Sequence, residues 1–454
     1  MPITRSGVFR AAVVLAAGLS GGLAFAQDGM VFEGEIGTTL RYFPSDGLYV
    51  GQDSSGISPI VDGRLSFSNE LENGQVVLEL SGRYNTRSKE GYADIPRGYF
   101  QYFGNGFDVL VGSNIEYWGV SESQQVVDVI NQTYNLGNPV DQQSLGQPMI
   151  NVNVYTGMNS SLSFYALLGF RERDFGDRDT RFRSPLGTNE DFAFFEEESN
   201  RHVDFAVRYR TSQNLGNASV DFAVSYFRGT DRDPKMLLGC TNETGGTPVA
   251  ACNAINTAAR AAYEANPNAF TGIPGALVTD ADAAAASVIS DTGFIPYYQS
   301  MQQLGLEFVY ARGDLQLTFE GALREAMDEN YFSGVIGAQY NFDNARVLGD
   351  SLVVIGEYLY DDRSNAQPVT IFDNDIFLGF IYGANDVNGS SLSGGMYFDV
   401  DTHSKIYSLK YSRRLSDSVS LDVAGFAIDS DDYTDPVALI DSDGYVELSL
   451  RYFF

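Results

Sequence analysis

The alternation of side chains in the last ten residues constrains the fold more than any other feature of the chain. From Val446 onward every second residue is apolar, and Glu447, Ser449 and Arg451 lie between the apolar positions. Successive side chains of a β-strand point to opposite faces, so this period of two predicts a strand with one apolar and one polar face. Such a strand needs an apolar environment on one side and water on the other.

Strand-like segments of this kind recur from residue 31 to the end of the chain. We predict about 18 strands, with 16 as the alternative count, because strand boundaries are the weakest part of such a reading. No stretch after residue 26 approaches ~18 consecutive apolar residues, so no spanning helix is predicted. The predicted strands are Val31–Phe43, Ser58–Leu71, Gly74–Asn85, Gly91–Phe103, Gly106–Trp118, Pro148–Tyr155, Ser161–Arg171, Arg201–Arg210, Ala218–Arg228, Gly293–Ala311, Asp314–Ala326, Tyr331–Phe342, Ser351–Tyr360, Phe372–Gly383, Leu392–Val400, His403–Arg413, Ser418–Ile428 and the C-terminal strand.

The apolar faces of these strands are predicted to meet lipid, and the charged faces to line a lumen. Backbone polar groups cannot stay unpaired in lipid, so the sheet has to close on itself. The predicted fold is all-β: a closed antiparallel transmembrane β-barrel formed by residues 27–454. With about 18 strands the lumen is too wide for side chains to fill, and it is expected to hold water. A soluble sandwich of this size would usually divide into domains, and no linker marks such a division.

Residues 1–26 have the organisation of a secretory signal peptide. Arg5 and Arg10 precede a short apolar stretch at 11–19, and Ala24-Phe25-Ala26 matches a cleavage site. We expect cleavage after Ala26. The whole chain carries 29 Lys and Arg against 59 Asp and Glu, a net charge of −30. This excess of acids argues against a nucleic-acid partner, because few cations are available to neutralise phosphates.

The connection at residues 118–147 holds the most distinctive pattern of the chain. Residues 118–123 read Trp-Gly-Val-Ser-Glu-Ser, with Val111-Gly112 before them and Asp128 and Ile130-Asn131 after them. This pattern resembles a motif, W-G-x-[ST]-E-S, of porin-like outer-membrane proteins of Gram-negative bacteria, many of them uncharacterised. The last strand likewise resembles the signal that the barrel-assembly machinery reads at an aromatic C-terminus, here Phe454. The resemblance implies a channel-like role without identifying a solute.

The segment after Trp118 is apolar enough to fold as a short helix or an extended piece inside the barrel. Porin-type proteins often narrow their lumen with such an inward loop, and the alternative is a rim loop that packs on the wall. Trp118 itself, at the end of a predicted strand, is expected at the membrane interface. The residues predicted to form the pore constriction and lumen are Glu116, Trp118, Glu122, Asp128, Asn131, Arg83, Arg208 and Arg451.

The alternation also assigns charges to the lumen wall and predicts a mild preference for cations. The acids assigned to the wall are Glu79, Asp204, Asp221, Glu320, Asp422 and Glu447, and the bases are Arg83, Arg208, Lys410 and Arg451. The loop at 171–200 is expected to be a solvated outer loop that binds divalent ions beside lipopolysaccharide. The alternative is a charged mouth that steers solutes.

The longest insertion, residues 231–291, contains the only two cysteines, Cys240 and Cys252. An exported protein meets an oxidising compartment, so we predict a disulfide that closes a small loop. Two cysteines without a nearby His make a poor metal site, and no metal site is predicted. The Ala-rich stretches 250–265 and 280–290 are predicted to form short helices of an extracellular loop, either over the pore mouth or outside it.

Chemistry-bearing motifs are few. After residue 26 the chain has only His202 and His403, and the Ser404 next to His403 would point to the opposite face of a strand. No phosphate-binding glycine loop, haem motif or zinc spacing is present, so neither an enzyme nor a cofactor is predicted.

Together these patterns predict an outer-membrane channel for passive diffusion of small hydrophilic solutes. Expected partners are outer-membrane lipid, lipopolysaccharide and the assembly machinery, and the oligomer is either a monomer or a homotrimer. The alternatives are a transporter of hydrophobic compounds and a surface receptor or adhesion barrel that binds through the 231–291 loop.

Overall fold

The computed structural model describes residues 29–454 with several interruptions. The described residues are 29–134, 138–140, 142–196, 202–242, 244–269, 291–345, 349–432 and 434–454. The predicted signal peptide and the second Ala-rich stretch, 280–290, lie outside them.

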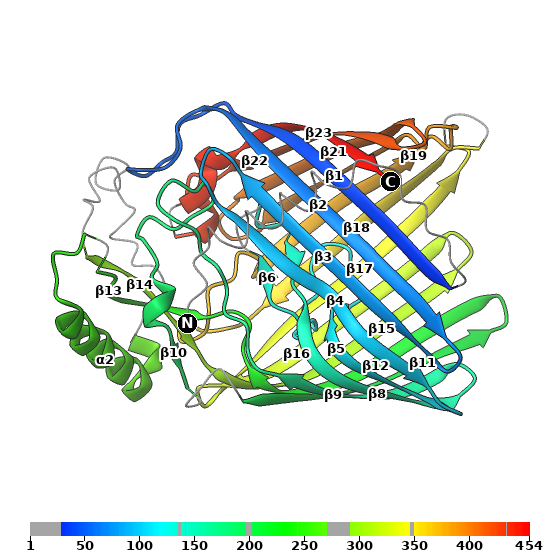
Figure 1. The fold of residues 1–454 in the computed structure, drawn as a ribbon, viewed down its shortest axis with the longest axis horizontal. Helices are drawn as coiled ribbons and strands as arrows, with labels where there is room; N and C mark the ends of the chain where they lie inside the picture. Colours follow the sequence, from blue (N-terminus) through cyan, green and yellow to red (C-terminus); the bar gives the residue numbers. More distant parts are fainter. Residues whose placement is uncertain are drawn as a thin grey trace.

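Eighteen antiparallel strands form one closed barrel (Figure 1). Each strand pairs with the next one along the barrel, and β23 pairs with β1 over the register Glu35↔Phe453 to Tyr42↔Val446, which closes the sheet. The barrel strands are β1 (Met30–Phe43), β2 (Gly56–Leu71), β3 (Gly74–Asn85), β4 (Gly91–Phe103), β5 (Phe107–Asn114), β8 (Gln147–Gly157), β9 (Ser160–Leu168), β11 (Val203–Leu215), β12 (Ala218–Thr230), β15 (Ser300–Arg312), β16 (Leu315–Ala326), β17 (Glu329–Asp343), β18 (Ser351–Asp361), β19 (Asn374–Gly383), β20 (Ser391–Asp399), β21 (Lys405–Ser416), β22 (Val419–Asp429) and β23 (Tyr445–Phe453).

The predicted fold and the count of 18 are confirmed, and two predicted strands need correction. The strand predicted at 106–118 ends at Asn114, so Trp118 lies in the following connection. The strand predicted at 293–311 is two strands, β14 (Thr292–Tyr298) and β15, and only β15 belongs to the barrel.

The two ends of the barrel differ in their connections. Turns at one end are short, such as residues 72–73 and 313–314, and the start of β1 and the end of β23 lie at this end. Long connections gather at the other end, at the left of Figure 1. One exception at the long end is the tight turn Met327-Asp328, whose residues have φ of 51° and 60°.

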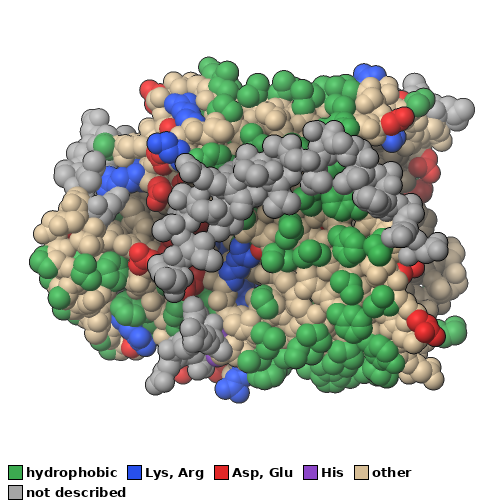
Figure 2. Space-filling model, in the orientation of Figure 1, with side chains coloured by type: hydrophobic (Ala, Val, Ile, Leu, Met, Phe, Trp, Pro, Cys, Tyr) green, Lys and Arg blue, Asp and Glu red, His purple; other side chains and the backbone are tan. Residues whose placement is uncertain are grey.

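The outer face of the barrel is apolar, as the alternation requires. On β23, Val446 and Leu448 are 55% and 43% exposed, and they alternate with inward side chains such as Glu447. Figure 2 shows hydrophobic side chains spread over the strands of one face, with most charged side chains toward the two ends. In the described part of the chain, no helix combines the length and apolarity needed to cross a membrane.

Two of the three clusters of buried apolar residues among the described residues lie inside the barrel, and the third lies in the unit formed by β13, β14 and α2. One cluster surrounds the connection after β5 and includes Trp118, Val127 and Ile130. A second cluster lies beneath the rim formed by β1 and β17–β23 and includes Phe43, Phe377 and Tyr397. Connections that fold into the barrel therefore contribute buried apolar side chains to these two clusters.

The described part of the 231–291 insertion forms a small unit beyond the long end of the barrel (Figure 1). Strand β14 pairs with β13 (Lys235–Cys240) and, in parallel, with β10 (Phe194–Phe195). Helix α2 (Val249–Ala265) packs on β13, and the predicted Cys240–Cys252 disulfide joins the two. The unit contacts the β18–β19 connection, where the Tyr263 hydroxyl donates to the Ala366 carbonyl at 2.7 Å. The remaining short elements are β6 (Thr133–Tyr134), β7 (Gln143–Ser144), η1 (Glu190–Phe192), η2 (Pro267–Ala269) and η4 (Pro436–Asp443).

Candidate functional site

The described part of the connection between β5 and β8, residues 115–134, 138–140 and 142–146, folds into the barrel; we call it the inward loop. It leaves the wall at Asn114, contains the two-residue pair β6–β7, and returns to the wall at Gln147. Its segment 119–127 reaches strands β15, β16 and β18, which stand well around the barrel from β5. The predicted inward-folded loop is therefore confirmed.

Three buried carboxylates on those strands hold the inward loop by its backbone. Glu320 on β16, which is fully buried, accepts hydrogen bonds from the backbone N–H of Val120 and Val127 at 2.9 Å and of Ser121 at 3.2 Å. Charge-assisted hydrogen bonds of this kind are stronger than neutral ones. Glu320 thus serves as an acceptor for a part of the loop that has no strand partner.

Glu357 and Glu307 extend this arrangement on each side of Glu320. Glu357 on β18 accepts the backbone N–H of Glu122 at 2.9 Å and of Ser123 at 2.8 Å, together with the Ser123 hydroxyl. Glu307 on β15 accepts the backbone N–H of Gly119 at 3.2 Å. Residues 119–123, most of the W-G-x-[ST]-E-S pattern, are therefore the part of the loop that docks on the far wall.

Trp118 and Gly119 have distinct structural roles at the start of this docked segment. The Trp118 ring is 1% exposed, packs edge-on against Tyr165 at 5.6 Å, and lies 5.5 Å from the Arg208 guanidinium. Arg208 makes a bidentate ion pair with Glu307 at 2.6 and 3.0 Å. Gly119 has φ of +111°, and a Cβ there would stand 2.9 Å from a Glu320 oxygen, so a side chain would disturb the docking. The expected interfacial position of Trp118 is wrong.

Asn131 ties the two ends of the inward loop together. Its side-chain oxygen accepts the Glu116 N–H at 2.9 Å, and its amide group donates to the carbonyls of Asn114 and Leu145 at 3.0 and 2.8 Å. Asp128 accepts the Ile130 N–H at 3.3 Å within the same loop. These two polar residues therefore help to fix the shape of the loop.

A cavity of about 570 Å³ lies between the inward loop and the wall formed by β1–β4 and β18–β23. Its acids slightly outnumber its bases, five to four. The charged residues that line it are Glu35, Asp62, Glu122, Asp422 and Glu447, and Arg64, Arg83, Lys410 and Arg451. Such a wall suits water and polar solutes rather than an apolar compound.

One row of residues crosses the wall of this cavity at a single level. The strand register places Arg451 of β23, Gly37 of β1, Asp62 of β2 and Arg83 of β3 side by side. Arg451 donates to Asp62 at 3.3 Å across Gly37, where a Cβ would stand 2.6 Å from the Asp62 carboxylate. The glycine therefore allows the Arg451–Asp62 pair to form between strands that are not neighbours.

A second cavity, of about 700 Å³, lies on the β8–β15 side of the barrel. Arg208, Asp221 and Glu307 line it together with Val120 of the inward loop, and the β8–β9 turn contributes Met158. The inward loop thus has a charged cavity on each side.

The connection between β9 and β11, residues 169–202, crosses the long end of the barrel; we call its described part the mouth loop. Arg181 forms a buried pair with Asp443 at 2.5 Å near the end of η4, and the Phe182 ring packs on Tyr445 at 6.0 Å. Glu90 of the β3–β4 connection accepts the Asp177 N–H at 2.7 Å and the Thr180 hydroxyl. Burial, reinforced by nearby aspartates, raises the pKa of Glu90 to about 8.

The structure divides the eight residues predicted for the lumen into two groups. Glu122, Arg83 and Arg451 line the cavity of about 570 Å³, and Arg208 lines the second cavity. Glu116, Trp118, Asp128 and Asn131 belong to the internal structure of the inward loop, and Trp118 and Asn131 are buried. The constriction role of this set stays a prediction.

Of the wall charges assigned by alternation, Glu447, Asp422 and Lys410 line the first cavity and Asp221 the second. Glu79 and Asp204 face inward but are held in ion pairs, with Arg64 and Arg97 and with Arg232 respectively. Sequence reasoning missed Asp62, Arg64, Glu307 and Glu357. The same period of two places all four residues on the inward face, so the sequence contains the signal that identifies them.

Comparison with known proteins returned no matching family model and no matching curated protein. Solved structures do match over most of the chain. Acinetobacter baumannii OccAB4 matches at 7% identity and a TM-score of 0.48 over 94% of this chain and 99% of that chain. Pseudomonas putida OprB matches at 10% identity and a TM-score of 0.42 over 94% of each chain. A mutant of the Rh. blastica porin matches at 10% identity and a TM-score of 0.40 over 94% of this chain and 100% of that chain.

These likenesses, with TM-scores of 0.40 to 0.48, carry no conclusion about solute, partner or oligomer. The fold assignment stands on the strand pairing, which closes eighteen antiparallel strands into one barrel around an inward loop. The chain is therefore a closed, 18-stranded antiparallel β-barrel with an inward-folded loop.

Proposed function

We propose that the protein is an outer-membrane channel through which small hydrophilic solutes diffuse passively. The observation that carries this proposal is the charged cavity of about 570 Å³ between the inward loop and the wall. A closed barrel isolates such a cavity from lipid, and its charged side chains keep it hydrated. The apolar outer face then meets acyl chains, and the last strand would present Phe454 to the assembly machinery.

In this mechanism the inward loop sets the size limit, and the facing charges select among solutes. Glu122 lies on the loop side, and Arg83 and Arg451 lie on the opposite wall, so a solute meets both signs of charge. Because the acids of the cavity only slightly outnumber its bases, a weak cation preference is expected. The energy for movement comes from the solute gradient alone.

The two alternatives have weaker support. A transporter of hydrophobic compounds needs an apolar lumen pocket, whereas both cavities are lined by charged residues. A receptor or adhesion role would use the insertion, whose helix α2 and disulfide build a compact unit at the long end. That unit is compatible with a channel, so it does not favour a receptor over a channel.

Conductance in a planar lipid bilayer tests the proposal. The refolded chain, residues 27–454, is expected to give stable steps, and replacing residues 126–143 by a short Gly-Ser linker is expected to enlarge them. A matched control replaces residues 384–390, a short-end turn, with a linker of equal length and should leave the steps unchanged. Correctly folded protein that inserts into the bilayer but conducts no ions would overturn the proposal. Current steps that stay unchanged after the loop replacement would show that the inward loop does not form the constriction.

A further inference from the structure

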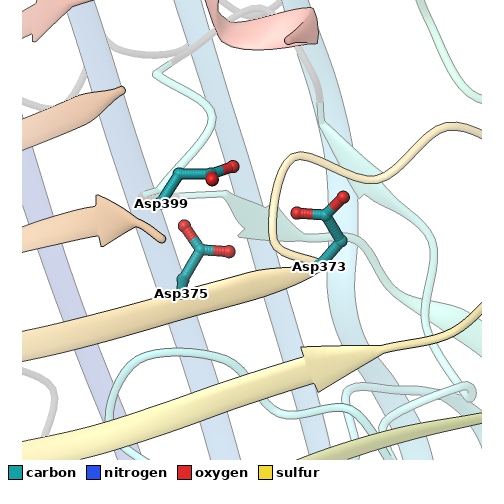
Figure 3. Close-up of side chains that lie close together, drawn as sticks. All are labelled: Asp373, Asp375 and Asp399. Atoms are coloured by element: carbon teal, nitrogen blue, oxygen red, sulfur yellow. The ribbon is translucent and has the colours of Figure 1, made fainter. Parts of the chain in front are cut away.

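The long end of the barrel carries a cluster of three aspartates that the channel function does not use. Asp373 precedes β19, Asp375 lies at the start of β19, and Asp399 ends β20. Each offers a carboxylate oxygen, and these oxygens lie within 4.8 Å of one another. Figure 3 shows the three carboxylates pointing toward a common space.

Asp375 gives the second observation, because one of its oxygens has no hydrogen-bond partner among the described residues. The side chain is 97% buried (3% exposed), and its Oδ2 is the atom without a partner. Buried polar atoms are nearly always hydrogen-bonded, and a buried carboxylate without a partner is costly. An oxygen in this position points to a ligand that supplies positive charge.

Protein cations do not fill this role. Among the described residues, no ion pair joins a Lys or Arg to Asp373, Asp375 or Asp399. The nearest bases in sequence are engaged elsewhere: Arg363 pairs with Asp361 at 2.6 Å, and Lys405 pairs with Asp429 at 2.9 Å. Three acids that share one space without a base repel one another unless a cation joins them.

The surroundings hold two of the three carboxylates in place. Asp399 Oδ1 accepts the backbone N–H of Asp401 and Thr402, each at 2.7 Å. The Thr402 hydroxyl donates to Asp435, the N-cap residue of η4, at 2.8 Å. Asp375 is fixed by its place in β19, where it pairs with Asp399 in the strand register. Carboxylate oxygens held in place in this way are better ligands for a metal ion than the oxygens of mobile surface side chains.

We propose that Asp373, Asp375 and Asp399 bind one divalent cation, with Ca²⁺ as the best match. A set of oxygen ligands only is typical of Ca²⁺ and Mg²⁺, and oxygens separated by up to 4.8 Å fit the longer bonds of Ca²⁺. Water would complete the coordination on the side of Asp373, which is exposed. The ion joins the β18–β19 and β20–β21 connections.

The site is linked by direct contacts to the inward loop. The Phe372 ring, next to Asp373, lies 4.8 Å from the Tyr397 ring, and the Tyr397 hydroxyl donates to the Ser123 carbonyl at 2.9 Å. Tyr397 also lines the cavity of about 570 Å³. The bound ion therefore rigidifies the part of the wall that supports the docked segment.

Calcium binding to the refolded protein in detergent, free of lipopolysaccharide, tests the proposal with Ca²⁺ itself as the probe. Equilibrium dialysis with radioactive calcium should show one saturable site that the Asp375→Asn variant lacks. The control Asp417→Asn removes an exposed acid at the short end and should keep the site. Mg²⁺ should compete at least tenfold more weakly than Ca²⁺.

Equal saturable binding by wild type and Asp375→Asn would overturn the proposal, and so would its absence from correctly folded wild type. If Asp375→Asn fails to fold, Asp373→Asn replaces it, because Asp373 is exposed and lies outside the strands. That variant should weaken Ca²⁺ binding at least tenfold while the barrel keeps its heat-modifiable migration on a gel. A channel that conducts normally without a calcium site would contradict this inference alone.

Discussion

Two charged side chains of the first cavity, Arg83 and Glu122, act separately from each other. Arg83 and Glu122 line the same cavity, one from β3 and the other from the loop. Neither forms an ion pair with another described residue, so the charge of each acts directly on ions in the lumen. The ion selectivity of the proposed channel should therefore respond to each of them separately.

We expect Arg83→Gln to raise the cation-to-anion permeability ratio about twofold, and Glu122→Gln to lower it by a similar factor. Reversal potentials in a salt gradient across a planar bilayer measure both changes. Arg312→Gln, an exposed position at the short end of β15, serves as the control and should leave the ratio unchanged. A shift of the same sign in both lumen variants would contradict the assignment of these charges.

Glu90 makes the docking of the mouth loop depend on pH. Its pKa is raised to about 8 by burial, so the folded state binds this proton more tightly than the unfolded chain does. Glu90 therefore contributes its full stabilisation of the folded state below a pH of about 4.5, the ordinary pKa of a Glu side chain. This contribution is lost as the pH rises through about 8. Trypsin should therefore cut the mouth loop several-fold faster at pH 8.5 than at pH 6, beyond the change in trypsin activity.

The Glu90→Gln variant isolates this effect, because the amide stays neutral at every pH. It should remove the extra pH dependence of cleavage, while Glu70→Gln, an exposed acid at the short end, should retain it. A wild-type mouth loop whose cleavage follows trypsin activity alone would show that Glu90 does not control the docking.

Among the elements, the inward loop depends most on one residue of the wall. Glu320 accepts three backbone N–H groups of the loop, and Glu320→Ala would leave all three without an acceptor. Each buried donor left unpaired costs about 1–3 kcal/mol, so we expect a loss of about 3 kcal/mol or more in the free energy of unfolding. Urea unfolding in lipid vesicles measures this loss.

The control for Glu320→Ala is Glu325→Ala, which removes an exposed acid from the same strand. Glu325→Ala should change the unfolding free energy by less than about 0.5 kcal/mol. Glu320→Ala should also increase current noise, because the released loop moves in the lumen. Equal stability of the two variants would mean that the carboxylate does not hold the loop.

The barrel strands could be predicted because their side-chain period is local. Wherever one face meets lipid, as on β23, the alternation is directly visible in the sequence. The exception is β14, which lies between two strands outside the barrel and is buried on nearly every residue. Only Gln299 separates β14 from β15, so no turn signal marks the boundary and the sequence predicts one strand over 293–311.

The docking of the inward loop could be predicted only in part. The W-G-x-[ST]-E-S pattern indicated an inward loop, but its partners Glu307, Glu320 and Glu357 lie about 190 to 235 residues away. No local rule connects such positions, and the period of two gives only the face on which each acid lies. The misplacement of Trp118 has a related cause, because β5 ends four residues earlier than the pattern suggested.

The whole molecule separates its apolar and charged side chains into an outer face and an inner one. The outer positions of β23 are about half exposed, a degree of exposure that a soluble core strand would not show. In the view of Figure 2, charged side chains gather mostly toward the two ends of the barrel rather than on this apolar face. This separation is the central claim, and the conductance, selectivity and size limit proposed here all depend on it.

Labelling at two adjacent positions of β23 tests that claim most directly. Ser449→Cys and Leu448→Cys each place one reactive thiol in the strand, while the natural cysteines stay joined in their disulfide. In lipid vesicles, a dye on Cys at position 448 should be quenched by brominated acyl chains, and a dye at position 449 should be quenched by iodide in water. The reverse pattern, or quenching of both dyes by iodide alone, would contradict the account.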